Sequence, residues 1–118
     1  MLYNIILNFI QYIFVPEKPH FIEKHSSSVM TVREKQNVTL PCKATGFPQP
    51  TIRWYRNGRV IEEKQRVKAG YLEIKEIQFE DRGIYTCTAE NLLGRDQLSI
   101  NLIVQGMHKS NKDLYRLC

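Results

Sequence analysis

The sequence predicts an all-β fold, a sandwich or a barrel of short strands. Runs of β-branched and aromatic residues alternate with polar residues at the two-residue period of a half-buried strand. Turn residues separate these runs at near-regular intervals, as is typical of a small all-β domain. No stretch that is long enough to form a helix shows the 3.6-residue period of an amphipathic helix.

The first half of the chain contains two clear strand patterns. The segment NVTLPCKA, residues 37–44, places alternate side chains on the inner face: Val38, Leu40, Cys42 and Ala44. GFPQP then breaks the chain with a glycine and two prolines. TIRWY resumes as a strand with Ile52 and Trp54 inward. The Asn57-Gly58 pair is a strong hairpin signal, and VIEE, residues 60–63, is the expected return strand.

Three further strands follow in the second half. YLEIKEI places Leu72 and Ile74 inward, and GIYTCTAE does the same for Tyr85, Cys87 and Ala89. NLLG, residues 91–94, is the expected turn. The last strand, QLSINLIV, turns a final apolar set toward the core: Leu98, Ile100, Leu102 and Val104. All these segments share the period of two, so the core is predicted to lie between two sheets or inside a barrel.

The composition favours one globular domain. The chain has 118 residues, and 42% hydrophobic with 25% charged residues excludes a disordered or collagen-like chain. The apolar segment 1–18 is shorter than the roughly 20 residues of a transmembrane helix. It lacks a basic n-region and small residues before a cleavage point, so it is either a weak signal peptide or a gene-model artefact. We expect a folded domain at 19–105, an unstructured tail at 106–118, and a longer parent protein.

The cysteines and histidines do not form a metal or catalytic pattern. Cys42, Cys87 and Cys118 lie too far apart for the close ligand pairs of a zinc site. No oxyanion-type glycine loop accompanies a Cys–His pair. We therefore expect no enzyme activity, no cofactor, no metal and no small-molecule substrate. The odd number leaves one cysteine over, and the plainest interpretation is a Cys42–Cys87 disulfide with Cys118 free.

The order Cys42, Trp54, Cys87, with Asp-x-Gly-x-Tyr-x-Cys at residues 81–87, resembles the immunoglobulin superfamily. The resemblance covers residues 19–105. It implies a Greek-key β-sandwich of two antiparallel sheets. It also implies a disulfide that joins the two sheets and packs on Trp54, with Leu72 in the same core.

The same resemblance gives roles to residues near the second cysteine. Tyr85 resembles the tyrosine corner, in which the hydroxyl group bonds to backbone a few residues upstream. Gly83 stands where the chain bends into that strand. Asp81 resembles an aspartate that pairs with a basic residue near the start of strand D, and Arg66 is the candidate partner.

Further motifs resemble the intermediate type of domain, the I-set. The interval between the cysteines is too short for the extra C″ strand of variable-type domains. Gly46-x-Pro48-x-Pro50, Asn91-x-x-Gly94 and a divided first strand in PHFIE…SSVMTVRE point the same way. Two loops depart from the pattern. Lys35 stands where these domains usually have glycine, and HSSS stands where a proline often marks the kink.

The resemblance implies a protein-interaction module, because members serve in adhesion molecules, receptors, matrix proteins and muscle proteins. The partner is then a protein, homophilic or heterophilic, and a spacer domain without a ligand is the alternative. Asn37-Val38-Thr39 is a glycosylation sequon with Asn37 facing outward. With the disulfide it favours an extracellular or cell-surface location. An intracellular muscle-type array is the alternative location.

The expected strands 51–55, 83–90 and 97–104 correspond to the family's strands C, F and G. The outward face of these three strands is the usual adhesive surface in this family. Alternation places these residues on it: Arg53, Tyr55, Thr86, Thr88, Gln97, Ser99 and Asn101. Arg53 and Tyr55 are the candidate anchors, since these two residue types are enriched at interaction hot spots. The plainer interpretation of the other residues is a solvated polar face.

A cluster of basic residues is a second candidate site, for heparan sulfate. Receptor domains of this family bind that polyanion in a comparable way. The candidate residues are Arg56, Arg59, Lys64, Arg66 and Lys68. Glu62 and Glu63 dilute the cluster, and a mixed solvated edge is the plainer interpretation. The net charge of +5 attracts polyanions weakly and does not by itself indicate nucleic acid.

Overall fold

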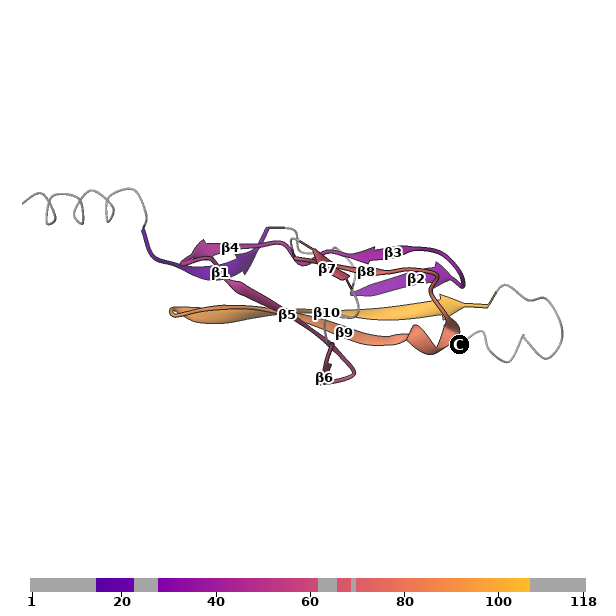
Figure 1. The fold of residues 1–118 in the computed structure, drawn as a ribbon. Coiled ribbons are helices and arrows are strands. Elements are labelled where there is room, and N and C mark those ends of the chain that lie inside the picture. The colour runs from indigo at the N-terminus through magenta and orange to yellow at the C-terminus, as the bar shows by residue number, and fades with distance from the viewer. Residues whose placement is uncertain (1–14, 23–27, 62–65, 69, 107–118) are drawn as a thin grey trace, which may run out of the picture.

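The fold of the protein is an all-β sandwich, as the sequence predicts (Figure 1). The computed structural model describes residues 15–22, 28–61, 66–68 and 70–106, with backbone alone for 66–68. In chain order the strands are β1 Glu17–Phe21, β2 Val29–Arg33, β3 Val38–Leu40, β4 Ala44–Phe47, β5 Thr51–Arg56, β6 Arg59–Val60, β7 Arg66–Lys68, β8 Tyr71–Ile74, β9 Gly83–Asn91 and β10 Gly94–Gln105. A 3₁₀ turn, η1 Phe79–Asp81, precedes β9. Within the described ranges, no helix is long and apolar enough to span a membrane.

The strands form two layers. One layer is a five-stranded sheet in the order β2-β10-β9-β5-β6. The other consists of the three-stranded sheet β3-β8-β7 and the pair β1-β4 (Figure 1). The strands β9 and β10 are the longest, and their antiparallel ladder forms the centre of the larger sheet. The outer face of that ladder carries the candidate functional site.

The larger sheet is mixed, whereas the resemblance implied two antiparallel sheets. β2 pairs with β10 in parallel, with Asn101 opposite Val29 and Gln105 opposite Arg33. These are the first and last strands of the sheet along the chain, and no hairpin joins them. Two parallel strands need a long connection between them, and the chain between β2 and β10 is long enough to provide it.

The predicted strand at 37–44 is divided in two. Pro41 lies between β3 and β4 and has no N–H group to donate to a ladder. β4 in turn extends through Gly46 and Phe47, where the sequence led us to expect a break. Its partner is β1, with Phe21 opposite Ala44 and Glu17 opposite Phe47.

The core lies between the layers and follows the predicted alternation closely. Trp54, Leu72 and Tyr85 are buried at its centre, and a disulfide joins Cys42 to Cys87, whose Cα atoms are 6.2 Å apart. The remaining core residues are Phe21, Val38, Leu40, Ile74, Ile77, Ala89, Ile100, Leu102 and Val104. Their burial supplies most of the driving force for folding, because apolar surface leaves water.

The Asn57-Gly58 turn links β5 to β6 as predicted. Both residues have positive φ angles, 48° and 82°, which is the requirement of a type I′ hairpin turn. The return strand is shorter than VIEE: β6 ends at Val60, and Ile61 then donates its backbone N–H to the Trp54 carbonyl oxygen at 2.9 Å. Residues 62 and 63 lie outside the described ranges.

Candidate functional site

The outer face of β5, β9 and β10 collects side chains in rows, one from each strand. Arg53 lies opposite Thr88, and Thr88 lies opposite Gln97. The next row toward the β9–β10 turn is Thr51, Glu90 and Arg95, and the row on the other side is Tyr55, Thr86 and Ser99. Because side chains alternate along a strand, all these residues point away from the core.

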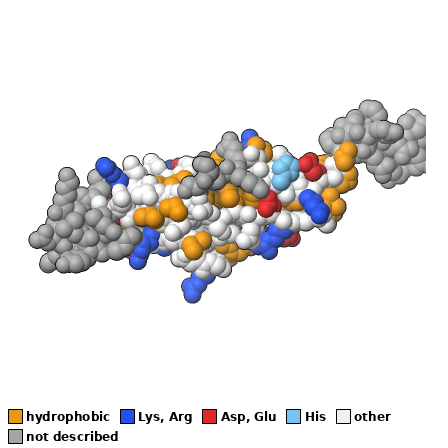
Figure 2. Space-filling view, turned by 180° about the vertical axis from the view of Figure 1, so that it is seen from behind, with side chains coloured by type: hydrophobic (Ala, Val, Ile, Leu, Met, Phe, Trp, Pro, Cys, Tyr) orange, Lys and Arg blue, Asp and Glu red, His pale blue; other side chains and the backbone are white. Residues whose placement is uncertain are grey.

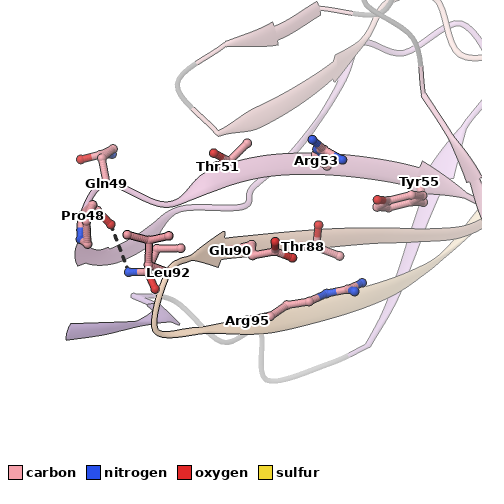
Figure 3. A pocket seen from close by; sticks show the side chains of 10 residues that line it. Pro48, Gln49, Thr51, Arg53, Tyr55, Thr88, Glu90, Leu92 and Arg95 are labelled. Carbon is pink, nitrogen blue, oxygen red and sulfur yellow. Dashed lines mark hydrogen bonds between the residues drawn. The ribbon is translucent and has the colours of Figure 1, made fainter. Parts of the chain in front are cut away.

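A hollow of about 480 Å³ lies in this outer face. Its lining residues come from the three strands and from the two turns that close one end, as Figure 3 shows. They are Pro48, Gln49, Thr51, Arg53, Tyr55, Thr88, Glu90, Asn91, Leu92 and Arg95. Both predicted anchors, Arg53 and Tyr55, are therefore in the hollow.

The charges of the hollow are two guanidinium groups and one carboxylate. Arg95 lies directly opposite Glu90 in the ladder, and Arg53 projects from the neighbouring strand β5. Among the residues that the structure describes, Arg53, Glu90 and Arg95 take part in no ion pair within 4.0 Å. The hollow therefore carries one net positive charge.

The side chain of Asn91 holds the closed end of the hollow together. Its Nδ2 donates hydrogen bonds to the carbonyl oxygens of Glu17, at 2.8 Å, and Pro48, at 3.1 Å. Its Oδ1 accepts a hydrogen bond from the backbone N–H of Leu93 at 2.9 Å. One side chain thus joins β1, the β4–β5 turn and the β9–β10 turn, which fixes the position of Leu92 beside Pro48.

Two features of the outer face differ from the prediction. Thr88 was expected to be exposed, but it is only 4% exposed, although it belongs to the lining of the hollow. Thr86 and Ser99 do not simply face solvent, since their hydroxyl groups form a hydrogen bond of 2.9 Å. The face is thus more closely packed than a freely solvated polar surface.

Sequence reasoning missed Glu90, Leu92 and Arg95. We expected the last strand to begin at Gln97, but β10 begins at Gly94. Extending the alternation backward from Gln97 would have placed Arg95 on the same face. No comparable signal marks Leu92, whose position depends on the hydrogen bonds of Asn91.

The tyrosine corner has the geometry that the resemblance implied. The Tyr85 hydroxyl group donates a hydrogen bond to the Asp81 carbonyl oxygen at 2.5 Å. Burial raises the pKa of Tyr85, the Asp81 carboxylate adds to this effect, and the Arg56 guanidinium opposes it. This contact ties β9 to η1 and orients the start of the strand that crosses the hollow.

The basic residue beside Asp81 is Arg56. Its guanidinium Nη1 lies 4.0 Å from the Asp81 carboxylate. Its Nη2 donates hydrogen bonds to the carbonyl oxygens of Glu80 and Arg82, the latter at 3.4 Å. We expected Arg66 in this place, and its side chain lies outside the described part. The Asp81 carboxylate also accepts a hydrogen bond of 2.7 Å from the Gln78 backbone N–H, which caps η1.

The candidate polyanion edge is distributed over two sheets. Arg59 is exposed on β6 of the larger sheet, whereas Arg66 and Lys68 belong to β7 of the smaller one. Lys64 lies outside the described ranges, and Arg56 is directed toward η1. On the face drawn in Figure 2, the Lys and Arg side chains are scattered and do not gather into one patch.

Gly83 has a second role besides the bend. A Cβ atom there would lie 2.7 Å from Oδ1 and 2.9 Å from Nδ2 of Asn57. That Oδ1 accepts a hydrogen bond from the Ile84 N–H at 2.9 Å, and the Asn57 N–H donates to the Ile84 carbonyl oxygen at 2.8 Å. The β5–β6 turn therefore packs on β9 only because residue 83 has no side chain.

Asn37 of the sequon is exposed just before β3, and Thr39 is exposed on that strand. The Asn37 Oδ1 accepts a hydrogen bond of 3.0 Å from the Glu76 backbone N–H. Attachment of a glycan uses Nδ2, so this hydrogen bond does not engage the modified atom. Within the described residues, no group of His, Cys, Asp and Glu side chains is arranged to hold a metal ion.

Known proteins with similar sequences and structures come from several settings. Smooth-muscle myosin light chain kinase of Gallus gallus is 39% identical over 106 residues, which is 85% of this chain and 6% of the kinase. The titin domains z1z2 in complex with telethonin superpose with a TM-score of 0.70 at 30% identity, covering 79% of this chain and 49% of that one. The insect immune protein hemolin gives 0.68 at 32% identity, covering 74% and 22%.

The match is to a small part of each relative. This chain spans between 2% and 9% of the length of the curated relatives that it matches. The family model described as "Immunoglobulin domain" matches residues 18–91, which is more than half of the chain. The sandwich, the inter-sheet disulfide and this match agree, so the chain belongs to the immunoglobulin superfamily.

Proposed function

We propose that this chain is an I-set immunoglobulin domain that serves as a non-enzymatic protein-interaction module of a longer adhesion or receptor protein. The observation that carries the proposal is the hollow in the outer face of β5, β9 and β10, which contains both Arg53 and Tyr55. Arginine and tyrosine at a concave site are the residue types that contribute most at protein interfaces. The partner is a protein, either a second copy of the chain or another molecule.

The comparisons support interaction as the general role of this family. The titin domains were solved in complex with telethonin, and the hemolin structure is described for its implications for homophilic adhesion. Immunoglobulin domains are generally non-enzymatic. The kinase activity of the chicken relative is not carried over, because this chain covers only 6% of that protein.

An extracellular or cell-surface location is part of the proposal. A disulfide between Cys42 and Cys87 persists in oxidising compartments, and exposed Asn37 and Thr39 suit a glycan. Expression in a secretory eukaryotic host tests whether Asn37 accepts a glycan. A mass shift that peptide N-glycosidase removes, and that Thr39→Ala abolishes, is the expected result. Thr39→Ala is preferable to a change at Asn37, which would also remove the hydrogen bond to Glu76.

A structural spacer is the second candidate function, and the likeness to the titin fragment I67-I69, a run of consecutive domains, favours it. A spacer would carry the same fold and an unused outer face. Heparan-sulfate binding is a third candidate function. It depends on Arg59, Lys64, Arg66 and Lys68, because Arg56 is engaged by η1.

Two variants distinguish these functions. Arg53→Ala/Tyr55→Ala removes the predicted anchors, and Arg59→Ala/Lys64→Ala removes cations from the basic edge. Self-association is measured by sedimentation equilibrium, and polyanion binding by salt elution from immobilised heparin, after melting curves show that each variant folds. An interaction module loses binding with the first variant and depends weakly on salt. A polyanion site loses heparin retention with the second and is strongly screened by salt.

A further inference from the structure

The hollow in the outer face has a chemistry that specifies more than a general protein partner. It brings together the two cations Arg53 and Arg95, the anion Glu90, and the exposed apolar side chain of Leu92. We propose that it binds an extended peptide segment of a protein partner, with one carboxylate side chain between Arg53 and Arg95 and a neighbouring apolar side chain on Leu92. This inference rests on the proposed function of the same face.

The charges favour a single carboxylate. Two guanidinium groups and one carboxylate leave one net positive charge, and neither arginine has an ion-pair partner within the described residues. A guanidinium group offers a planar pair of donors that matches a carboxylate. Glu90 offsets one of the two positive charges, so the net charge of the hollow matches one acidic residue better than the repeated charges of a sulfated polymer.

The turn that carries the apolar contact is held in place before a partner binds. Leu92 is 91% exposed at the β9–β10 turn, and Leu93 beside it is 42% exposed. Asn91 fixes this turn, because its side chain donates to the carbonyl oxygens of Glu17 and Pro48 and accepts from the Leu93 backbone N–H. A preorganised apolar contact binds with a smaller loss of conformational entropy than a mobile one. A leucine side chain that is 91% exposed contributes little to the core, so packing does not explain its apolar character at position 92.

The spacing of the lining residues matches an extended segment. The row containing Arg53 and the row containing Glu90 and Arg95 are two residues apart along the strands, about 6.5–7 Å. Alternate side chains of an extended peptide repeat at the same distance. A carboxylate set between the arginines therefore places the next side chain on the same face near Leu92, where the hollow is closed by the turns.

The test uses the 118-residue chain and a displayed library of short random peptides, panned at physiological ionic strength. We expect the selected peptides to have a common pattern: one Asp or Glu, and an aliphatic or aromatic residue two positions away. A synthetic copy of a selected peptide and its Glu→Gln or Asp→Asn counterpart are then titrated by fluorescence anisotropy. We expect the neutral counterpart to bind at least about tenfold more weakly, which corresponds to about 1.4 kcal/mol.

Charge exchange locates the contact. Arg95→Glu should weaken binding of the acidic peptide by at least the same factor of about ten. It should strengthen binding of a peptide that carries Lys in place of the acidic residue. Arg33→Glu makes the same change in net charge on β2, outside the lining of the hollow, and should leave binding unchanged. Arg95→Gln provides a milder variant if Arg95→Glu lowers the melting temperature.

Each other outcome overturns a stated part. One such outcome is that the selected peptides carry no acidic residue and bind in a way that depends on Arg53 and Tyr55 but not on Arg95. That result refutes this inference and leaves the proposed function standing. Selected peptides that bind Arg53→Ala/Tyr55→Ala with the same affinity as the parent chain refute both this inference and the proposed function. Failure to select any peptide refutes both as well. Self-association that Arg95→Glu abolishes would identify a second copy as the occupant and refute the peptide.

Discussion

The Tyr85 hydroxyl group donates a hydrogen bond of 2.5 Å to the backbone carbonyl oxygen of Asp81, four residues upstream. This contact joins the end of η1 to β9, the strand that runs from the tyrosine corner through the disulfide to the hollow. The Asp81 carboxylate caps η1, and Arg56 of β5 holds the same turn through its carbonyl oxygens. The corner thus positions one end of β9, and Asn91 positions the other.

Tyr85→Phe tests the energetic contribution of the corner. The ring remains buried, so the apolar contribution is kept, and only the hydrogen bond to Asp81 is lost. We expect the free energy of unfolding to fall by about 0.5–1.5 kcal/mol, as for one hydrogen bond. Urea denaturation followed by tryptophan fluorescence measures this, and an unchanged midpoint would mean that the hydroxyl group has no stabilising partner.

The same tyrosine predicts a loss of stability at alkaline pH. Burial raises the pKa of Tyr85 above its ordinary value near 10, so the folded state holds the hydroxyl proton more tightly than the unfolded state. That contribution is fully present below about pH 10 and is lost as the pH rises toward the folded pKa. The stability of the parent chain minus that of Tyr85→Phe isolates it from other titrations. A difference that is constant or grows above pH 10 contradicts the assignment.

Lys35→Gly should stabilise the protein. Lys35 has a φ of 69°, a left-handed conformation that costs a residue with a Cβ atom roughly 1–2 kcal/mol. Its backbone N–H donates to the Ile77 carbonyl oxygen at 2.7 Å, and glycine keeps that bond. The greater entropy of glycine in the unfolded chain offsets part of the gain, which leaves about 0.5–1 kcal/mol. Lys35→Ala, which removes the charge but keeps Cβ, is the control and should give no gain in thermal or urea denaturation.

The packing of Asn57 on Gly83 predicts a coupled pair of substitutions. Gly83→Ala places a Cβ atom within 3 Å of the Asn57 amide group, at a φ of 148° that already strains alanine. We expect a destabilisation on the order of 1–3 kcal/mol. Asn57→Gly keeps the positive φ of the turn and removes the side chain. Gly83→Ala should therefore cost less in that background, and equal costs in a double-mutant cycle would contradict the contact.

Much of the fold could be predicted from the sequence because the period of two is a local property. It placed Trp54, Leu72, Tyr85 and both bonded cysteines in the core and identified the strands that form the outer face. At Lys35 the sequence indicated only a departure from the glycine that is usual in similar domains, and the structure gives this residue a φ of 69°.

The contacts that the sequence did not reveal join residues far apart in the chain. Arg56 meets η1 across 24 residues, and Asn57 meets Ile84 across 27. Alternation states which face a side chain occupies but not which neighbour it bonds. The 4% exposure of Thr88 on this outer face was likewise not predictable from alternation, which assigns a face but not a degree of burial. The hollow arises from such contacts.

The central claim is that binding occurs at the outer face of β5, β9 and β10, and backbone-amide NMR of the labelled chain tests it most directly. A selected peptide is titrated, and the amide shifts are assigned to residues. We expect the largest changes at Arg53, Tyr55, Glu90 and Arg95, with the three-stranded sheet β3-β8-β7 unaffected. Changes centred on β3, β7 or β8, with the hollow undisturbed, would contradict the account.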